Sequence, residues 1–245
     1  MKRLQGLIRS AVEAYGMIEE GDRIAVGLSG GKDSLALLTG LAGLRDYYPA
    51  NFSLQAITLD LGFEGGGDFD ALAAHCARLE VPFLLERTEI GPLIFDRRAE
   101  RHPCALCARL RRGALNRLAV QQGCNKVALG HHLDDAVETL LLMLFYEGRL
   151  GSFYPVTALS RTGLTVIRPL ILMEEREVAR LAARLRLPVM YNPCCANGNT
   201  KRQEVKQLLA ELERGNPGLR RRIFGALRRS GLYGWGAEET PAEGE

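Results

Sequence analysis

A six-residue stretch, Ser29-Gly30-Gly31-Lys32-Asp33-Ser34, constrains this chain more than any other part of the sequence. It follows the short apolar run 23–26, which is typical of a buried strand, and leads into the run 35–38, which predicts a helix. A strand that turns through two glycines into a helix exposes backbone N–H groups at the positive end of the helix dipole. The stretch therefore predicts an anion-binding site at the end of a strand.

The stretch differs from the phosphate-binding loop of kinases and GTPases. That loop has a glycine five residues before its final glycine and a Ser or Thr directly after the lysine, whereas this chain has Val26 and Asp33 at those places. The stretch instead resembles the pyrophosphate loop of the N-type ATP pyrophosphatases, or PP-loop proteins. The resemblance implies cleavage of ATP between its α- and β-phosphates and adenylation of a carbonyl oxygen of the substrate.

Strand-like and helix-like segments alternate along the chain. The alternation predicts an α/β fold in which a Rossmann-like (HUP-type) parallel sheet of five strands carries helices on both faces, with an N-terminal helix and a basic C-terminal helical extension added. The expected strands cover 23–26, 52–61, 82–85, 125–129 and 164–172, the last of which contains Pro169. The expected helices of the domain include 70–79, 134–145 and 174–185.

Acidic residues and a glycine follow two of the expected strands. Asp60 ends the second strand, and Gly130 to Asp135 follow the fourth. Because the carboxyl ends of parallel strands border the ligand crevice of such sheets, we expect these residues near the 29–34 stretch. Carboxylates there could hold Mg²⁺ or act in acid–base chemistry. Asp134 is well placed to cap the following helix, so Asp135 is the better functional candidate.

Composition and charge divide the chain into four expected parts. These are an N-terminal helix at 1–20, a PP-loop ATP pyrophosphatase domain at 21–190, a cysteine-containing loop with a basic helical extension at 191–232, and an acidic, disordered tail at 233–245. The net charge is only +3, but the basic side chains gather in the extension, which predicts contact with an RNA backbone. No apolar run is long enough to span a bilayer and no signal peptide is present, so we expect a cytoplasmic protein without membrane contact.

The six cysteines favour metal binding or catalysis over disulfides. Cys104, Cys107 and Cys194 together would leave one iron of a 4Fe-4S cluster without a protein ligand. Adding Cys195 makes four ligands, which suits tetrahedral structural zinc equally well, so the spacing leaves both metals open. The other two, Cys76 and Cys124, are expected in the core, where a free cysteine behaves as a small apolar residue.

Four motifs occur in a fixed order: residues 29–34, 103–113, 129–135 and 192–194, with Lys201-Arg202-Gln203 after the last. The ordered set resembles the TtcA family of tRNA 2-thiocytidine biosynthesis proteins over about residues 20–230. The resemblance favours an iron–sulfur cluster over zinc. It implies that the C2 oxygen of an anticodon-loop cytidine in tRNA is adenylated with loss of pyrophosphate, and that sulfide held on the open iron then displaces AMP.

The resemblance also implies roles for individual residues. Lys32 would neutralise phosphate charge, Asp135 would orient Mg²⁺ or substrate, and adenine would lie near Leu59 and Asp60. Arg111 stands where uridine-thiolating relatives have a lysine, and an arginine cannot accept a proton. The implied catalytic residues are Lys32, Asp60, Arg111 and Asp135; the implied ATP-binding residues are Gly27, Leu28, Ser29, Gly30, Gly31, Lys32, Asp33, Ser34, Leu59, Asp60, Gly130, His131 and Asp135.

The cluster ligands implied by the resemblance are Cys104, Cys107 and Cys194. The candidate RNA-binding residues are Arg109, Arg112, Lys201, Arg202, Arg220, Arg221 and Arg222. The implied partners are tRNA, a cysteine desulfurase or other sulfide donor, and a second copy of the chain in a homodimer. The implied cofactors are ATP, Mg²⁺ and the 4Fe-4S cluster.

Three other functions remain open. A ligase of the tRNA-lysidine type, here stabilised by zinc, would share the nucleotide loop but would not need the cysteines for its reaction. A non-catalytic module that binds nucleotide or RNA would bind ATP without releasing pyrophosphate. A sulfur-transferring enzyme could act on a small molecule, although the basic extension argues against it.

Overall fold

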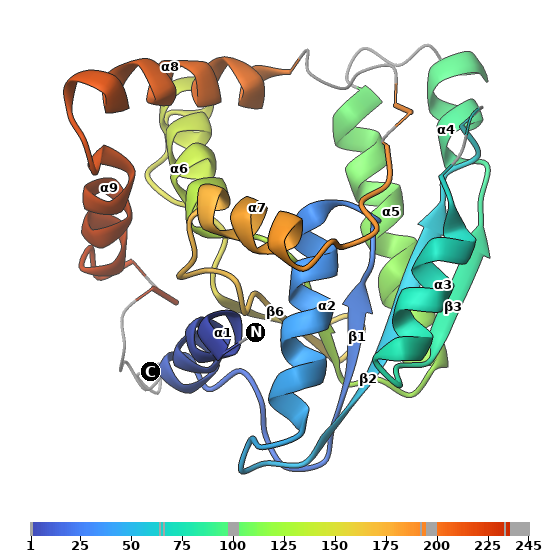
Figure 1. Ribbon diagram of the computed structural model, residues 1–245. Helices are drawn as coiled ribbons and strands as arrows, with labels where there is room; N and C mark the ends of the chain where they lie inside the picture. The colour runs from blue at the N-terminus through green and yellow to red at the C-terminus, as the bar shows by residue number, and fades with distance from the viewer. Residues whose placement is uncertain are drawn as a thin grey trace, which may run out of the picture.

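Six strands form one sheet in the order β3-β2-β1-β4-β6-β5 in the computed structural model, which describes residues 2–63, 65, 67–97, 103–191, 193–194, 200–232 and 234–235 (Figure 1). The strands are β1 Asp22–Gly27, β2 Phe52–Asp60, β3 Phe83–Arg87, β4 Lys126–Ala128, β5 Val156–Leu159 and β6 Leu164–Ile167. β1 lies between β2 and β4 and pairs with both in parallel. The α/β fold with a largely parallel sheet is therefore confirmed, and the 29–34 stretch leaves the sheet from its middle.

The expected number of strands was wrong by one. The sheet has a sixth strand, β5, which pairs antiparallel with β6 at the edge. β5 and β6 form a hairpin whose turn includes Gly163 at φ +70°, a backbone conformation that glycine adopts at little cost. The expected strand at 164–172 ends at Ile167, because Pro169 has no N–H to continue the ladder.

The helices are α1 Lys2–Ala14, α2 Lys32–Arg45, α3 Phe69–Arg78, α4 Ile90–Pro92, the π-helix η1 Leu93–Arg97, α5 Pro103–Gln121, α6 Leu133–Glu147, α7 Glu175–Arg184, α8 Lys201–Gly215 and α9 Leu219–Arg228. α1 ends at Ala14 rather than near residue 20. α5 was not expected as a helix. The division into domains stays a prediction, and residues 236–245 of its acidic tail lie outside the described residues.

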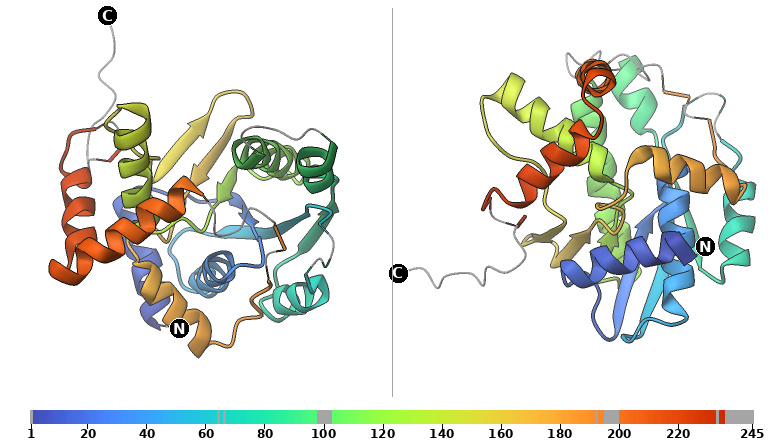
Figure 2. Two further views of the ribbon diagram at one scale, coloured as in Figure 1. Left: turned by 90° about the horizontal axis from the view of Figure 1, so that it is seen from above. Right: turned by 60° about the vertical axis from the view of Figure 1, so that its left-hand side comes forward.

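Two apolar clusters cover the two faces of the sheet. Along β1, Ile24 and Val26 belong to the larger cluster and Ala25 to the smaller one, because successive side chains of a strand point to opposite faces. α2 is the centre of the larger cluster, with α1, α3, α6 and α7 contributing to it, while α5 covers the other face (Figure 2). The basic helices α8 and α9 pack on α6 and join the larger cluster through Val205, Leu209, Phe224 and Leu227.

Cys76 and Cys124 are buried among apolar side chains, as expected. Burial raises the pKa of the Cys76 thiol to about 11, so this group stays protonated near neutral pH. Neither thiol belongs to the site described below.

Gly130 lies directly against the first turn of α2. A Cβ on Gly130 would lie 3.0 Å from the carbonyl carbon of Asp33 and 3.1 Å from the backbone nitrogen of Ser34. These are backbone atoms of the helix start, which cannot move aside cheaply. The sequence expectation placed Gly130 beside the nucleotide loop, and the close approach gives it a packing reason to be glycine.

We expect Gly130→Ala to destabilise the protein by about 1–3 kcal/mol, the usual cost of overpacking. Urea unfolding measures the change. Gly113→Ala is the matched control, because a Cβ on this helical residue of α5 would meet nothing within 4 Å, and alanine favours a helix over glycine. Equal stability of the Gly130→Ala protein and the wild type would contradict the packing argument.

Candidate nucleotide and cysteine site

The 29–34 stretch forms a tight loop between β1 and α2. Gly30 has φ +78°, which explains a glycine at this position. The Ser34 hydroxyl donates to the Gly31 carbonyl at 3.0 Å, and the Ser29 N–H donates to Ser34 Oγ at 3.2 Å. Gly31 is the N-cap of α2 and has no side chain to bond the first-turn N–H groups. The loop therefore offers backbone donors at a helix start, the arrangement that binds phosphates.

Residues that the sequence analysis did not single out hold this loop. Thr58 Oγ1 donates to the Leu28 carbonyl at 2.7 Å, and the Met190 N–H donates to the Gly30 carbonyl at 2.9 Å. The Met190 side chain fills the space beside Gly30 and Gly67, since a Cβ on Gly67 would lie 1.7 Å from Met190 Cε. A threonine and a methionine in these contexts carry no sequence signal of such a role.

Lys32 lies at the start of α2 between two carboxylates. Its Nζ is 3.0 Å from Asp33 Oδ2 and 3.1 Å from Glu175 Oε1. Partial burial acts to lower the pKa of Lys32, but the charges and hydrogen bonds of Asp33 and Glu175 outweigh it and raise that pKa above the usual value. Lys32 is therefore a cation beside the loop, as expected, but with a carboxylate partner from α7 that the sequence did not predict.

Leu59 and Asp60 end β2, next to the carboxyl end of β1. Leu59 is half-buried against the smaller apolar cluster. Asp60 Oδ1 accepts the Gly62 N–H at 2.9 Å, and the Asp60 carbonyl accepts the Thr88 hydroxyl at 2.9 Å. The end of β2 is thus fixed at the edge of the sheet where the sequence placed it.

The start of α6 corrects one expectation. The N-cap is His132 rather than Asp134. His132 Nδ1 accepts the Asp135 N–H at 3.4 Å, and Asp135 Oδ2 accepts the His132 N–H at 2.9 Å, which together form a capping box. Asp134 is buried and accepts the backbone N–H of Glu175 at 2.7 Å. A histidine N-cap lies outside the usual Ser, Thr, Asp and Asn preference, so the pattern pointed to the wrong residue.

His131 stacks on Phe153 with the ring centroids 4.9 Å apart, and the Arg168 guanidinium lies 4.8 Å from the centroid of the same Phe153 ring. Burial and the nearby Arg168 charge lower the pKa of His131 to about 4. Its Nδ1 is buried without a hydrogen-bond partner among the described residues. His131 is thus a neutral imidazole behind Asp135, and its predicted contact with nucleotide stays a prediction.

Cys104 and Cys107 lie on the first turn of α5, where Cys104 is exposed and Cys107 is buried. Burial raises the pKa of Cys107, Arg111 lowers it, and charge on Cys194 or Cys104 raises it. Charge on Cys194 and on Cys104 thus acts on Cys107, and the assignment of these three thiols as metal ligands stays a prediction. Within the described parts of the chain, however, no three His, Cys, Asp or Glu side chains gather closely enough to hold an ion. Cys195 lies outside the described residues.

The candidate RNA-binding side chains fall into two groups. Arg109 and Arg112 are exposed on α5, as is Arg111. The side chains of the C-terminal helices are engaged with protein groups: Lys201 pairs with Glu204, Arg202 with Asp135 and Glu138, Arg220 with Asp134, Arg221 with Glu174, and Arg222 bonds Asn216 and the Pro217 carbonyl.

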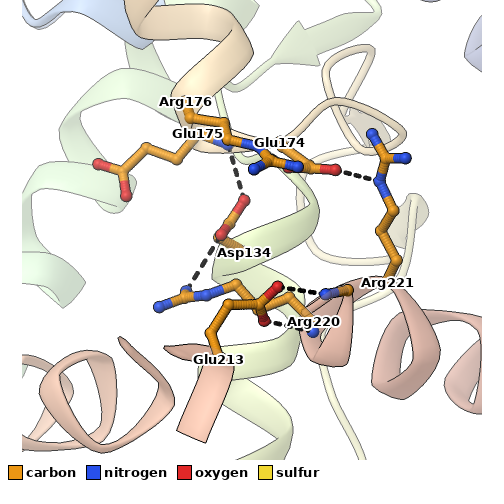
Figure 3. Close-up of a pocket in the computed structure, with 8 residues that line it drawn as sticks. Asp134, Glu174, Glu175, Arg176, Glu213, Arg220 and Arg221 are labelled. Carbon is orange, nitrogen blue, oxygen red and sulfur yellow. Dashed lines mark hydrogen bonds and ion pairs between the residues drawn. The ribbon is translucent and has the colours of Figure 1, made fainter. Parts of the chain in front are cut away.

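A pocket of about 220 Å³ lies among these charges, between α6, α7, α8 and α9 (Figure 3). Arg220 Nη1 donates to Asp134 Oδ1 at 3.1 Å across it. Glu213 accepts the N–H groups of Gly218 at 2.6 Å and Arg220 at 3.0 Å, which fixes the start of α9. All four acidic side chains that line the pocket have cationic or N–H partners, so the pocket is a junction between helices.

A model of the PP-loop domain matches residues 3–212. The chain belongs to the PP-loop domain family. The tRNA-cytidine(32) 2-sulfurtransferase of Geobacter sulfurreducens is 43% identical over 92% of this chain and 89% of that protein. The protein of the same name from Syntrophotalea carbinolica is 42% identical over 92% of this chain and 88% of its own length.

Among solved structures, the U34-tRNA thiolase NcsA from Methanococcus maripaludis, with its 4Fe-4S cluster, superposes with a TM-score of 0.75 at 26% identity and covers 94% of this chain and 78% of that chain. The NMN synthetase of Francisella tularensis shares the fold, with a TM-score of 0.52 at 16% identity over 98% of this chain and 97% of that one. The resemblance to the TtcA family of tRNA 2-thiocytidine biosynthesis proteins, drawn from the sequence, is confirmed.

We expect an NMR titration of this PP-loop protein to give a His131 pKa of about 4, so the ring stays neutral at pH 5.5. An unfolded histidine titrates near 6.5, so the unfolded chain binds more protons between these two values. The contribution of the neutral His131 ring to the free energy of unfolding is complete above pH 6.5, and it is lost as the pH falls toward 4. His131→Gln should flatten the pH dependence of stability in this range. A His131 pKa near 6.5 would contradict the burial argument.

Proposed function

We propose that this protein is a tRNA-cytidine 2-sulfurtransferase that uses ATP to activate cytidine 32, the position given in the names of its relatives. It forms AMP and pyrophosphate and replaces the C2 oxygen with sulfur. One observation of the structure carries the proposal. The segment that ends at Cys194 is bonded to the PP-loop, because the Met190 N–H donates to the Gly30 carbonyl at 2.9 Å. This bond holds Met190, four residues before Cys194, against the loop, which supports a site that combines ATP and sulfur chemistry.

The nucleotide half of the reaction falls to the PP-loop and its neighbours. The N–H groups of the 29–34 stretch bind the phosphates, with Lys32 neutralising their charge. Gly27, Leu28 and Gly130 give the loop its close packing, and Leu59, Asp60 and His131 line the nucleoside side. Mg²⁺ prefers oxygen ligands, and Asp33 Oδ1 is a buried oxygen without a hydrogen-bond partner in the described chain. We assign Asp135 as the second carboxylate that binds the Mg²⁺ ion.

The sulfur half of the reaction falls to Cys104, Cys107 and Cys194. Thiolates are soft ligands that suit iron–sulfur clusters and zinc, and the charges of Cys104 and Cys194 both act on Cys107. A 4Fe-4S cluster, when bound there, supplies an iron that can carry sulfide to the activated cytidine. Burial raises the pKa of Cys107, and the Arg111 charge acts in the opposite direction, toward the thiolate that a metal requires.

The exposed arginines of α5 and the basic helices α8 and α9 are the surface that we assign to tRNA. A tRNA approaching the three thiols meets Arg109 and Arg112 first, and Lys201, Arg202 and Arg220 to Arg222 lie on the helices beyond. A cysteine desulfurase or another source of sulfide supplies the sulfur atom. The family resemblance implies a homodimer, and the composition of the sequence is the basis for the proposed cytoplasmic location. The structure has no helix, among the residues it describes, of the length and apolar character that a membrane span requires.

The function is tested by incubating tRNA with ATP, Mg²⁺, sulfide, lysine and the anaerobically purified protein, and by mass spectrometry of the nucleosides. We expect 2-thiocytidine with wild-type tRNA and none when cytidine 32 is replaced by uridine. Pyrophosphate release with lysine joined to cytidine would instead identify a tRNA-lysidine ligase. ATP binding without pyrophosphate release would identify a binding module.

We expect the anaerobic wild type to be brown, with about four irons per chain. Cys194→Ala should lose the iron and the thiolation but keep ATP binding, because the PP-loop is intact. Absorption spectra with iron, sulfide and zinc analysis measure this. Cys195→Ala is the neighbouring control and should keep the cluster. A colourless wild type with one tightly held zinc would overturn the cluster.

We expect Arg112→Gln to affect mainly tRNA binding and Arg220→Gln to affect mainly the stability of the fold. Arg112 is exposed, so its loss should leave stability within about 0.5 kcal/mol and reduce the salt dependence of tRNA binding by about one charge. Arg220 neutralises buried Asp134, so its loss should destabilise the fold by about 3 kcal/mol. Urea unfolding and filter binding at several salt concentrations measure the two effects. An equal loss of stability in both variants would contradict the distinction between an exposed arginine and one that neutralises a buried carboxylate.

A further inference from the structure

One carboxylate bridges two lysines beside the PP-loop. Lys32 Nζ lies 3.1 Å from Glu175 Oε1, and Lys206 Nζ lies 2.8 Å from the same oxygen and 2.6 Å from Oε2. Lys32 starts α2, Glu175 starts α7 and Lys206 belongs to α8. A lysine of the basic extension is therefore a close neighbour of the PP-loop lysine, although the two are far apart in the sequence.

The arrangement is one that a phosphate would also satisfy. Two ammonium groups repel each other unless an anion lies between them, and a phosphate offers more charge and more acceptor oxygens than a carboxylate. A lysine ammonium binds phosphate as a point charge, so it does not need the planar, two-bond geometry with which an arginine binds a phosphate or a carboxylate. Both lysines and Glu175 are partly exposed, with side-chain exposures of 30%, 37% and 25%, so an incoming ligand can reach them.

The backbones around this bridge are fixed independently of it. The Glu175 N–H donates to Asp134 Oδ2 at 2.7 Å, and Arg220 donates to Asp134 Oδ1 at 3.1 Å and to the Lys206 carbonyl at 3.4 Å. In Figure 3 the Glu175 side chain points away from Glu174. An exchange of anions between the lysines therefore needs only side-chain rotation.

We propose that Glu175 occupies the place of an ATP phosphate between Lys32 and Lys206, and that Lys206 is a second lysine of the polyphosphate site. The inference deepens the proposed function, since it rests on ATP as the ligand. When ATP binds, its β- and γ-phosphate oxygens replace the Glu175 carboxylate between the two ammonium groups. α8 then contributes to nucleotide binding as well as to the basic surface.

The ionisation states agree with this exchange. Burial acts to raise the pKa of Glu175, but the hydrogen bond from Lys206 and the charges of both lysines lower it to about 2. Glu175 is therefore an anion at neutral pH, and the lysines are cations that phosphate can bind. The other charged group facing Lys32 is Asp33, at 3.0 Å, and those near Glu175 from α6 and α9 are Asp134 and Arg220.

The test is calorimetric titration of the full-length protein, without tRNA, with ATP, pyrophosphate and AMP in the presence of Mg²⁺. We expect Lys206→Gln to weaken ATP and pyrophosphate about tenfold and AMP less than twofold, because AMP has no β- or γ-phosphate. Arg214→Gln is the matched control, since it removes one exposed cation from the same helix. Thermal unfolding of each variant checks that it is folded.

Glu175→Gln is a second test, in which the expected change of ATP affinity is opposite to that of Lys206→Gln. Because it removes the anion that competes with phosphate, we expect ATP to bind at least as tightly as in the wild type. Unchanged ATP and pyrophosphate affinity in Lys206→Gln, an equal loss for AMP, or weaker ATP binding in Glu175→Gln would each overturn the inference. These titrations do not depend on sulfur transfer, so a wild type that binds ATP but forms no thiolated cytidine contradicts only the proposed function.

Discussion

No side chain caps the first turn of α2, and close packing from several parts of the chain holds this turn in place. Gly31 brings no capping side chain, Gly130 lets the end of β4 approach within van der Waals contact, and Met190 packs on Gly30 from the far end of the chain. A buried donor without a partner is costly, so such a turn persists where a ligand supplies the partner. The packing around this turn is therefore consistent with the anion site that the sequence predicts.

A second constraint is charge balance at the N-termini of α6 and α7. Asp134, Glu138 and Glu174 are buried carboxylates, and buried charges are tolerated only when they are paired. The cations come from α8 and α9, through Arg202, Arg220 and Arg221. The basic helices α8 and α9 therefore neutralise buried carboxylates of α6 and of the start of α7.

The sequence predicted most of the fold where a local pattern carries the information. The strand, loop and helix around Lys32 follow from apolar runs and glycines. It missed β5, because four residues at a sheet edge show no clear alternation. It left α5 unassigned, because arginines interrupt an apolar stripe in which the buried residues are Cys107, Leu115, Leu118 and Ala119. It misplaced the cap of α6, because His132 is an unusual cap.

By itself the sequence determined the chemistry that the chain can hold. The PP-loop, the cysteine pair and the acidic motif are each local, and the residue types within them predict anion and metal binding. Only the tertiary structure decided which charges meet. Lys32 and Glu175 are 143 positions apart, and Glu175 and Lys206 are 31 apart. The local sequence around a Glu at the start of a helix is the same whether the side chain faces solvent or a lysine. The same holds for a Lys on an amphipathic helix. Their pairing depends on how α7 and α8 pack against α2 and α6, which is a property of the whole core.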